Sequence, residues 1–449
     1  MNQPADTIAA IATPPGKGGI GIVRISGPRV SEIMQALFHK QLSPRRAELL
    51  PFKNTAGETL DRGIALFFEA PHSYTGEDVL ELQGHVGPVV LNLLLQRILE
   101  LGARLAGPGE FTERAFLNDK MDLAQAEAVI DLIESSSEQG VKAAARSLEG
   151  AFSGDVQRLL AKLKHVRMYI EAALDFPEEE IDFLSDAHLH KNVAGLCGEI
   201  DSVLESAHQG RLLKEGLSIV ILGRPNAGKS SLLNRLAGRD SAIVTEFPGT
   251  TRDVLREHIH IDGLPLHIID TAGLRDSDDP IEQEGVKRAW KEVEKADRVL
   301  LLVDNRLGLG PVEERILERI PAMLPVDIIH NKLDLHGEKP FLSKTPRGVV
   351  AGLSVKTGEG WQLLTDHLKK SVGYEQTAEN QYSARRRHIE ALKTVKICVN
   401  GAQQRLMEGA GELAAEELRL AQEALSRVTG EFSSDDLLGE IFSNFCIGK

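Results

Sequence analysis

One run of eight residues, at positions 223–230, constrains the fold of this chain more than any other part of its sequence. The run reads GRPNAGKS and fits the pattern G-x-x-x-x-G-K-[ST] without a mismatch. An apolar, β-branched run precedes it at residues 219–222, and a helical pattern follows at residues 231–237. A strand, a glycine-rich turn and a helix in this order direct backbone N–H groups and a helix N-terminus toward a phosphate. The motif therefore predicts a phosphate site where one strand ends.

Four more apolar runs alternate with helical stretches after this motif. They cover residues 266–269, 299–303, 326–329 and 349–353. Continuous apolar strands that alternate with helices are typical of a parallel sheet covered on both faces. We therefore expect an α/β domain over residues 216–373.

Three short motifs, each following a strand of this domain, predict which nucleotide binds. Asp270 opens the run DTAG and is placed to bind Mg²⁺, while the Gly273 N–H is placed for the γ-phosphate. Asp334 closes the run NKLD, and its carboxylate can accept hydrogen bonds from the N1–H and the 2-amino group of guanine. Adenine lacks this donor pair. The run SVK at residues 354–356 would place a backbone N–H on the guanine O6. In this order the motifs resemble those of Ras-like GTPases and predict GTP.

The first motif also supplies charge and a metal ligand. We expect Lys229 to contact the β and γ phosphates and Ser230 to bind Mg²⁺. Thr251, assigned by resemblance, would supply a second Mg²⁺ ligand from the loop between the first two motifs. The expected GTP-binding residues are Asn226, Ala227, Gly228, Lys229, Ser230, Ser231, Thr245, Glu246, Phe247, Pro248, Gly249, Thr250, Thr251, Asp270, Thr271, Ala272, Gly273, Asn331, Lys332, Leu333, Asp334, Ser354, Val355 and Lys356.

Leu274 stands where Ras-like enzymes carry a glutamine that orients the attacking water. A leucine side chain can neither donate nor accept a hydrogen bond, so another group must orient the water. The charged residues that follow are Arg275, Asp276, Asp278, Asp279, Glu282 and Glu284, and composition alone does not choose among them.

The rest of the chain shows two other sequence patterns. Residues 1–118 combine short β-like runs, Gly- and Pro-rich turns and one helix at residues 86–101, which predicts an α+β domain. Residues 119–215 and 374–449 carry helical apolar spacing, so the α/β domain is expected to be inserted into an all-α domain. The run GKGGIG at residues 16–21 imitates a dinucleotide motif. A strand-like run follows it where that motif requires a helix, so we reject this interpretation.

Composition excludes several classes of protein. The chain has 52 Lys and Arg against 66 Asp and Glu, and this net charge of −14 argues against a broad basic face for nucleic acid. Cys197, Cys398 and Cys446 are too far apart for a disulfide framework or a zinc pattern. No run of 18 apolar residues occurs, so we expect a cytoplasmic protein without membrane association. Whether Cys446 is inert or chemically active stays open.

Several segments together resemble one family over essentially the whole length. They lie at residues 12–16 (ATPPG), 78–84 (DVLELQG), 107–112 (GPGEFT), 116–127 (FLNDKMDLAQAE), 223–231 and 446–449 (CIGK). The chain resembles the MnmE (TrmE) family of tRNA-modification GTPases. This resemblance implies an N-terminal domain similar to folate-dependent aminomethyltransferases, which forms a homodimer and binds 5-formyltetrahydrofolate or another tetrahydrofolate derivative. Arg24, Glu81, Lys120 and Lys449 match the family's folate positions.

The resemblance also implies which reaction the protein catalyses and which residue orients the attacking water in place of Leu274. With the FAD-dependent partner MnmG (GidA), in a heterotetramer, the family adds an aminomethyl-type group (carboxymethylaminomethyl) to carbon 5 of the wobble uridine of tRNAs. Its GTPase domains pair across the nucleotide and use K⁺ where other GTPases use an arginine finger. Asn226, Thr245, Phe247 and Thr250 match the K⁺ ligands, and Glu282 matches the residue that positions the water. Val355 stands where the family often has alanine.

Three rival functions are weaker. A ribosome-assembly or translation GTPase would need an RNA-binding module, and no KH signature or basic C-terminal domain appears. A switch that only binds effectors does not explain the folate-like domain or the CIGK tail. A stand-alone folate aminomethyltransferase would have no use for GTP.

Overall fold

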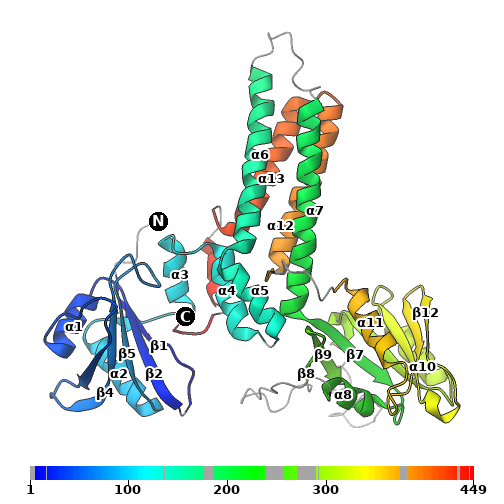
Figure 1. Ribbon diagram of the computed structural model, residues 1–449, viewed down its shortest axis with the longest axis horizontal. Coiled ribbons are helices and arrows are strands. Elements are labelled where there is room, and N and C mark those ends of the chain that lie inside the picture. Colours follow the sequence, from blue (N-terminus) through cyan, green and yellow to red (C-terminus); the bar gives the residue numbers. More distant parts are fainter. Residues whose placement is uncertain are drawn as a thin grey trace. The chain divides into compact units, whose positions relative to one another are not determined.

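A computed structural model of the chain shows two compact units (Figure 1). The first contains residues 1–130, 147–197 and 391–449, and the second contains residues 131–146 and 198–390. The structure describes residues 6–16, 18–135, 137–175, 187–238, 256–270, 290–291, 293–374, 382–431, 435–443 and 445–448. The domain boundaries expected after residues 118, 215 and 373 stay predictions.

Six strands form a sheet in the first unit, in the order β3-β4-β5-β2-β1-β6. They are β1 (Ile8–Ile11), β2 (Gly18–Ser26), β3 (Glu48–Lys53), β4 (Thr59–Phe68), β5 (Val79–Val86) and β6 (Arg104–Leu105). Neighbouring strands are antiparallel except for β1 and β6. Because the glycine-rich run at residues 16–21 continues into β2 and not into a helix, the rejection of a dinucleotide motif is confirmed.

Two helices, α1 (Val30–Phe38) and α2 (Pro88–Glu100), pack on one face of this sheet. Val23 and Ile25 of β2 point into that core, so Arg24 between them belongs to the opposite face. The helix expected at residues 86–101 is confirmed as α2, which begins at a proline, a residue whose fixed φ suits the first helical position.

Helices make up the rest of the first unit and continue into the second. They are α3 (Glu110–Leu117), α4 (Leu123–Glu134), α5 (Glu138–Leu148), α6 (Ala151–Asp175), α7 (Ala187–Glu215), α12 (Arg386–Met407), α13 (Gly411–Thr429) and α14 (Asp435–Ser443). The long helices α6 and α13 lie side by side (Figure 1). Leu418 and Leu425 of α13 are buried, whereas Leu413 and Leu420 of the same apolar pattern are exposed.

The second unit contains a seven-stranded sheet in the order β12-β13-β11-β10-β7-β9-β8. Its strands are β7 (Leu217–Gly223), β8 (Arg256–Ile261), β9 (Leu264–Asp270), β10 (Arg298–Asp304), β11 (Val326–Asn331), β12 (Phe341–Thr345) and β13 (Gly348–Gly352). The five central strands are parallel, and the outer strands β8 and β12 are antiparallel to their neighbours. This topology confirms the α/β class expected from the apolar runs.

Both faces of this sheet are covered, which explains why its strands are apolar without alternation. Ile219 and Ile221 pack with α8 (Lys229–Ala237) and α11 (Trp361–Ser371) on one face. Val220 and Leu222 lie in a separate core that α10 (Pro311–Arg319) helps to cover. None of the helices in the described part of the chain combines the length and the apolar composition that a membrane span requires.

Candidate functional site

The loop between β7 and α8 is shaped by two glycines. Gly223 has φ 144° and Gly228 has φ 107°, a backbone region that disfavours other residues. A Cβ atom on Gly223 would lie 2.3 Å from the Leu302 carbonyl oxygen, and one on Gly228 would lie 2.3 Å from Asn331 Nδ2. The loop can therefore form only with glycine at both positions. Its last residue, Gly228, is the N-cap of α8, so the positive end of the helix dipole closes the loop.

Lys229, the first residue of α8, lies across this loop. Its Nζ donates to the carbonyl oxygens of Gly223 at 2.8 Å and Arg224 at 3.0 Å. A phosphate is a stronger acceptor for an ammonium than a neutral carbonyl, so a bound nucleotide can take over these hydrogen bonds. Ser230 and Ser231 follow on α8 and are exposed.

Asn331, at the end of β11, joins this phosphate loop to the predicted base-binding segments. Its Nδ2 donates to the Ala227 carbonyl oxygen at 2.9 Å. Its Oδ1 accepts from the backbone N–H groups of Lys332 at 2.8 Å and Val355 at 3.0 Å. One buried amide thus connects the first, third and fourth sequence motifs, which lie together at one edge of the sheet.

Lys332 forms a second connection to the phosphate loop. Its Nζ donates to the Asn226 carbonyl oxygen and to Asp304 Oδ2, each at 2.7 Å. Hydrogen bonds from Arg306 and then from Lys332 hold the pKa of Asp304 well below its ordinary value, so this carboxylate is charged at neutral pH. Asp304 was not among the predicted site residues, although it directly follows the apolar run at residues 299–303.

Asp334 and Ser354, expected to contact the base, lie next to each other. Ser354 Oγ donates to Asp334 Oδ1 at 2.6 Å and accepts from the Thr357 N–H at 3.2 Å. Leu333 is fully buried below them, in the short 3-10 helix η2 (Leu333–Leu335). The Asp334 carboxylate is therefore fixed on a rigid support, as selective hydrogen bonding to a base requires.

The remaining nucleotide and metal predictions lie outside the described residues. These are Thr245, Glu246, Phe247, Pro248, Gly249, Thr250, Thr251, Thr271, Ala272, Gly273, Glu282 and the side chain of Asp270. Of the expected metal ligands, the structure describes Ser230 and Asn226. Both carry side-chain oxygens suited to Mg²⁺ and K⁺, and both are exposed beside the phosphate loop. The described residues contain no cluster of three or more His, Cys, Asp or Glu that could hold a metal ion.

A second group of predicted residues lies on the first sheet, on the face away from α1 and α2. Arg24 of β2 and Glu81 of β5 are direct cross-strand partners, and Arg24 Nε donates to Glu81 Oε1 at 3.0 Å. The Arg24 guanidinium also lies over the rings of Tyr74, at 5.4 Å, and Phe111, at 5.7 Å. A carboxylate and a guanidinium can match the ring donors and the anionic tail of a folate, and the partly exposed Tyr74 can lie against its flat ring. Phe111 is fully buried and can only support Arg24 from the core side.

Lys120 and the C-terminal segment belong to the same unit. Lys120 Nζ donates to the Pro71 carbonyl oxygen at 2.9 Å, on the loop that also carries Tyr74. Ile447 forms a β-bridge with Pro108, and the Gly109 N–H donates to the Cys446 carbonyl oxygen at 3.4 Å. The tail is thus docked and not frayed, with Cys446 exposed. Lys449 lies outside the described residues.

A phosphate loop after β7 and the Asn331–Asp334 segment after β11, on one largely parallel sheet, define a GTPase of the P-loop class. A family model described as the MnmE helical domain matches residues 123–446, and one described as the GTP-binding protein TrmE N-terminus matches residues 7–120. The chain belongs to the MnmE family and is a GTP hydrolase.

Curated relatives of the same family are similar to this chain over nearly its whole length. The tRNA modification GTPase MnmE of Yersinia pseudotuberculosis (strain PB1/+) is 57% identical over 99% of this chain and 99% of its own. The protein of the same name from Pectobacterium atrosepticum is 56% identical over the same shares. Among solved structures, the G domain of the FeoB iron transporter of T. maritima is 22% identical and covers 34% of this chain and 97% of its own. The TM-score of this match is 0.26.

Proposed function

We propose that this GTPase modifies tRNA, in the cytoplasm and as a homodimer. With a partner of the FAD-dependent MnmG (GidA) type, in a heterotetramer, it would add a carboxymethylaminomethyl-type group to carbon 5 of the wobble uridine. The observation that carries this proposal is the presence, in one chain, of converging nucleotide motifs and of the Arg24–Glu81 pair on the first sheet, where we propose a folate site. A GTPase that only assembled ribosomes or bound effectors would not need the second site.

The described residues at the nucleotide site have different roles. Gly223 and Gly228 shape the loop around the phosphates, Lys229 supplies charge, and Asn331 holds the loop against the base-binding segments. We assign Ser230 and Thr251 to Mg²⁺, and Asn226, Thr245, Phe247 (through its carbonyl) and Thr250 to K⁺. When bound, these cations offset the negative charge that grows on the phosphate oxygens during hydrolysis. Glu282 would hold the water that attacks.

Hydrolysis of GTP should be faster in KCl than in NaCl of equal ionic strength. If K⁺ stabilises charge in the transition state, we expect a stimulation of about tenfold in kcat. Glu282→Ala should abolish the stimulation, because the cation cannot compensate for a misplaced water. The measurement is the steady-state rate of phosphate release at saturating GTP.

Glu284→Ala is the matched control, since it removes a carboxylate from the same charged segment without touching the assigned position. It should keep the response to KCl. Equal slow rates of the unsubstituted protein in both salts would contradict the K⁺ assignment and favour the alternative, a ribosome-assembly or translation GTPase of the same class.

The protein should be retained on a resin that carries a tetrahydrofolate derivative, because the proposed folate site on the first sheet would bind it. Arg24→Ala removes the guanidinium for the anionic tail and the ion pair with Glu81, so we expect the folate affinity to fall about tenfold or more. Arg62→Ala is the control, because Arg62 is an exposed arginine of the same sheet on β4, which β5 separates from β2. Equal retention of the two variants would exclude Arg24 as a folate contact.

A further inference from the structure

Arg235, on α8, contacts the loop that is expected to read the guanine O6. Its NH1 group donates to the Val355 carbonyl oxygen at 2.5 Å and to the Lys356 carbonyl oxygen at 3.4 Å. The same helix begins at Lys229, in the phosphate loop. Arg235 therefore links the helix that follows the phosphate loop to the segment on the base side.

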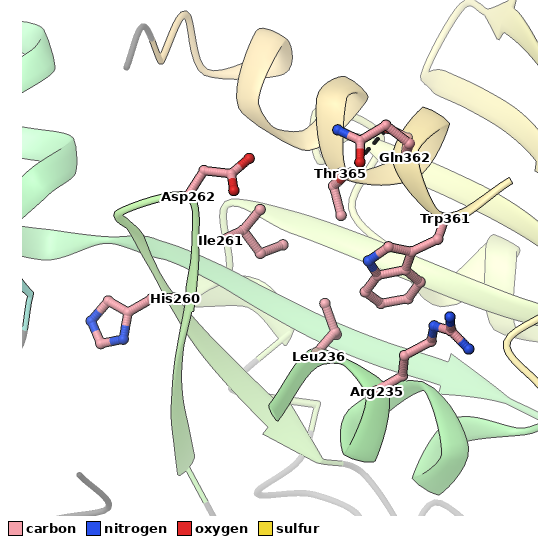
Figure 2. Close-up of a pocket in the computed structure, with 8 residues that line it drawn as sticks. All are labelled: Arg235, Leu236, His260, Ile261, Asp262, Trp361, Gln362 and Thr365. Atoms are coloured by element: carbon pink, nitrogen blue, oxygen red, sulfur yellow. Dashed lines mark hydrogen bonds between the residues drawn. The ribbon is translucent and has the colours of Figure 1, made fainter. Parts of the chain in front are cut away.

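The guanidinium of Arg235 is held in one position. It lies 5.4 Å from the centre of the Trp361 ring, and Figure 2 shows the two side chains next to each other in the wall of a cavity of about 70 Å³. Gly358 has φ 90°, and a Cβ atom there would lie 2.0 Å from Arg235 NH2. The loop therefore needs a glycine at this point to let the arginine reach its carbonyl groups.

The position of the Arg235 side chain has an energetic cost, which its contacts with the loop must offset. Arg235 Nε is buried and has no hydrogen-bond partner within the part of the chain that the structure describes. A buried N–H without a partner is unfavourable. The ring contact and the two carbonyl contacts therefore hold the side chain in a place that it would otherwise avoid.

The planarity of the peptide bond explains how Arg235 can act on the base. The Val355 carbonyl and the Lys356 N–H belong to one planar trans peptide group and point in opposite directions. Because Arg235 fixes the carbonyl, it also fixes the direction of the Lys356 N–H. On the other side of the loop, the Val355 N–H donates to Asn331 Oδ1. The loop is thus held by Asn331 through its N–H side and by Arg235 through its carbonyl side.

We propose that Arg235 is a positioning residue for guanine recognition, which orients the Val355–Lys356 peptide so that its N–H meets O6 of the base. This inference rests on the proposed nucleotide site. It implies discrimination against adenine, because adenine carries an amino group at carbon 6 and would oppose one donor with another.

The test is Arg235→Met, which keeps most of the apolar contact with Trp361 and removes the donors. Inosine triphosphate retains O6 but lacks the 2-amino group, and ATP lacks O6. We expect the Kd of GTP and of inosine triphosphate to rise by the same factor, about tenfold, while the Kd of ATP does not change. The KM for GTP should rise and kcat at saturating GTP should stay constant.

Arg319→Ala is the matched control. Arg319 lies 4.2 Å from the centre of the Trp290 ring in the same unit, so its loss removes a similar ring contact away from the loop. It should leave all three affinities unchanged. Arg235→Lys retains the charge but cannot span both carbonyl groups, and it should give a loss smaller than that of Arg235→Met.

Two outcomes would overturn the proposal. One is an unchanged Kd of GTP in Arg235→Met or, if that variant does not fold, in Arg235→Lys. The other is a loss for GTP that inosine triphosphate does not share, because the effect would then act through the 2-amino group and not through O6. If the unsubstituted protein bound ATP as tightly as GTP, the proposed nucleotide site itself would be wrong.

Discussion

Asp334→Asn should change the preferred nucleotide from GTP to xanthosine triphosphate. The carboxylate accepts from two guanine donors, whereas the asparagine amide would direct its own N–H₂ group at one of them. The loss of two hydrogen bonds to a charged acceptor is about 4 kcal/mol, so the affinity for GTP should fall roughly 10³-fold. Xanthine carries a carbonyl at carbon 2 and can accept from the new amide, so its affinity should rise. Competition binding with the two nucleotides measures both changes.

The structure suggests that this change acts on the base and not on the fold. Ser354 Oγ donates to Asp334 Oδ1, and the amide oxygen of the asparagine can still accept that hydrogen bond. Glu314→Gln is the control, because it neutralises an exposed carboxylate on α10. If Asp334→Asn bound GTP as tightly as the unsubstituted protein, the guanine assignment would have to be given up.

Gly228→Ala should abolish most nucleotide binding although it adds only one methyl group. The new Cβ would lie 2.3 Å from Asn331 Nδ2, which donates to the Ala227 carbonyl oxygen. The substitution therefore combines backbone strain at φ 107° with the loss of a buried hydrogen bond. Together these cost about 3–4 kcal/mol, or roughly 10²–10³-fold in the Kd of GDP and GTP. Fluorescent nucleotide titration measures the loss.

Gly308→Ala is the control, because it places an alanine at a positive φ without a steric clash between the new Cβ and another side chain. Gly308 also has a positive φ, of 64°, but among the described residues no atom other than those of its two chain neighbours lies within 4 Å of an added Cβ. This variant should be slightly less stable and should bind GTP normally. An equal loss of affinity in both variants would contradict the assignment of the loss to the contact between the new Cβ and Asn331.

The central sheet could be predicted because its strands are buried on both faces. Their apolar runs are continuous, and the site residues follow because parallel strands end at the same edge of the sheet. The outer strands β8 and β12 were not predicted. The side chains of β12 are mostly exposed, so its sequence lacks an apolar run. An edge strand that faces water does not need the pattern by which strands are recognised.

Other parts of the site depend on contacts that no local pattern encodes. Arg235 resembles an ordinary surface cation of a helix, and its contacts with Val355 and Lys356 are 120 and 121 residues away in the chain. The positions of Arg24 and Glu81 came from resemblance alone, and the register of β2 and β5 then makes them partners. The metal ligands of residues 245–251 stay predictions.

During synthesis, α6 leaves the ribosome well before its packing partner α13 has been made. In the finished protein Phe152, Leu159, Leu163 and Ile170 of α6 are buried. The partner helix α13 begins about 235 residues after α6 ends, and ribosomes add about 5–20 residues per second. An emerging chain therefore spends about 10–50 seconds with an apolar helix face that has not yet met α13. During that interval a chaperone able to cover one amphipathic helix would protect the nascent protein from aggregation.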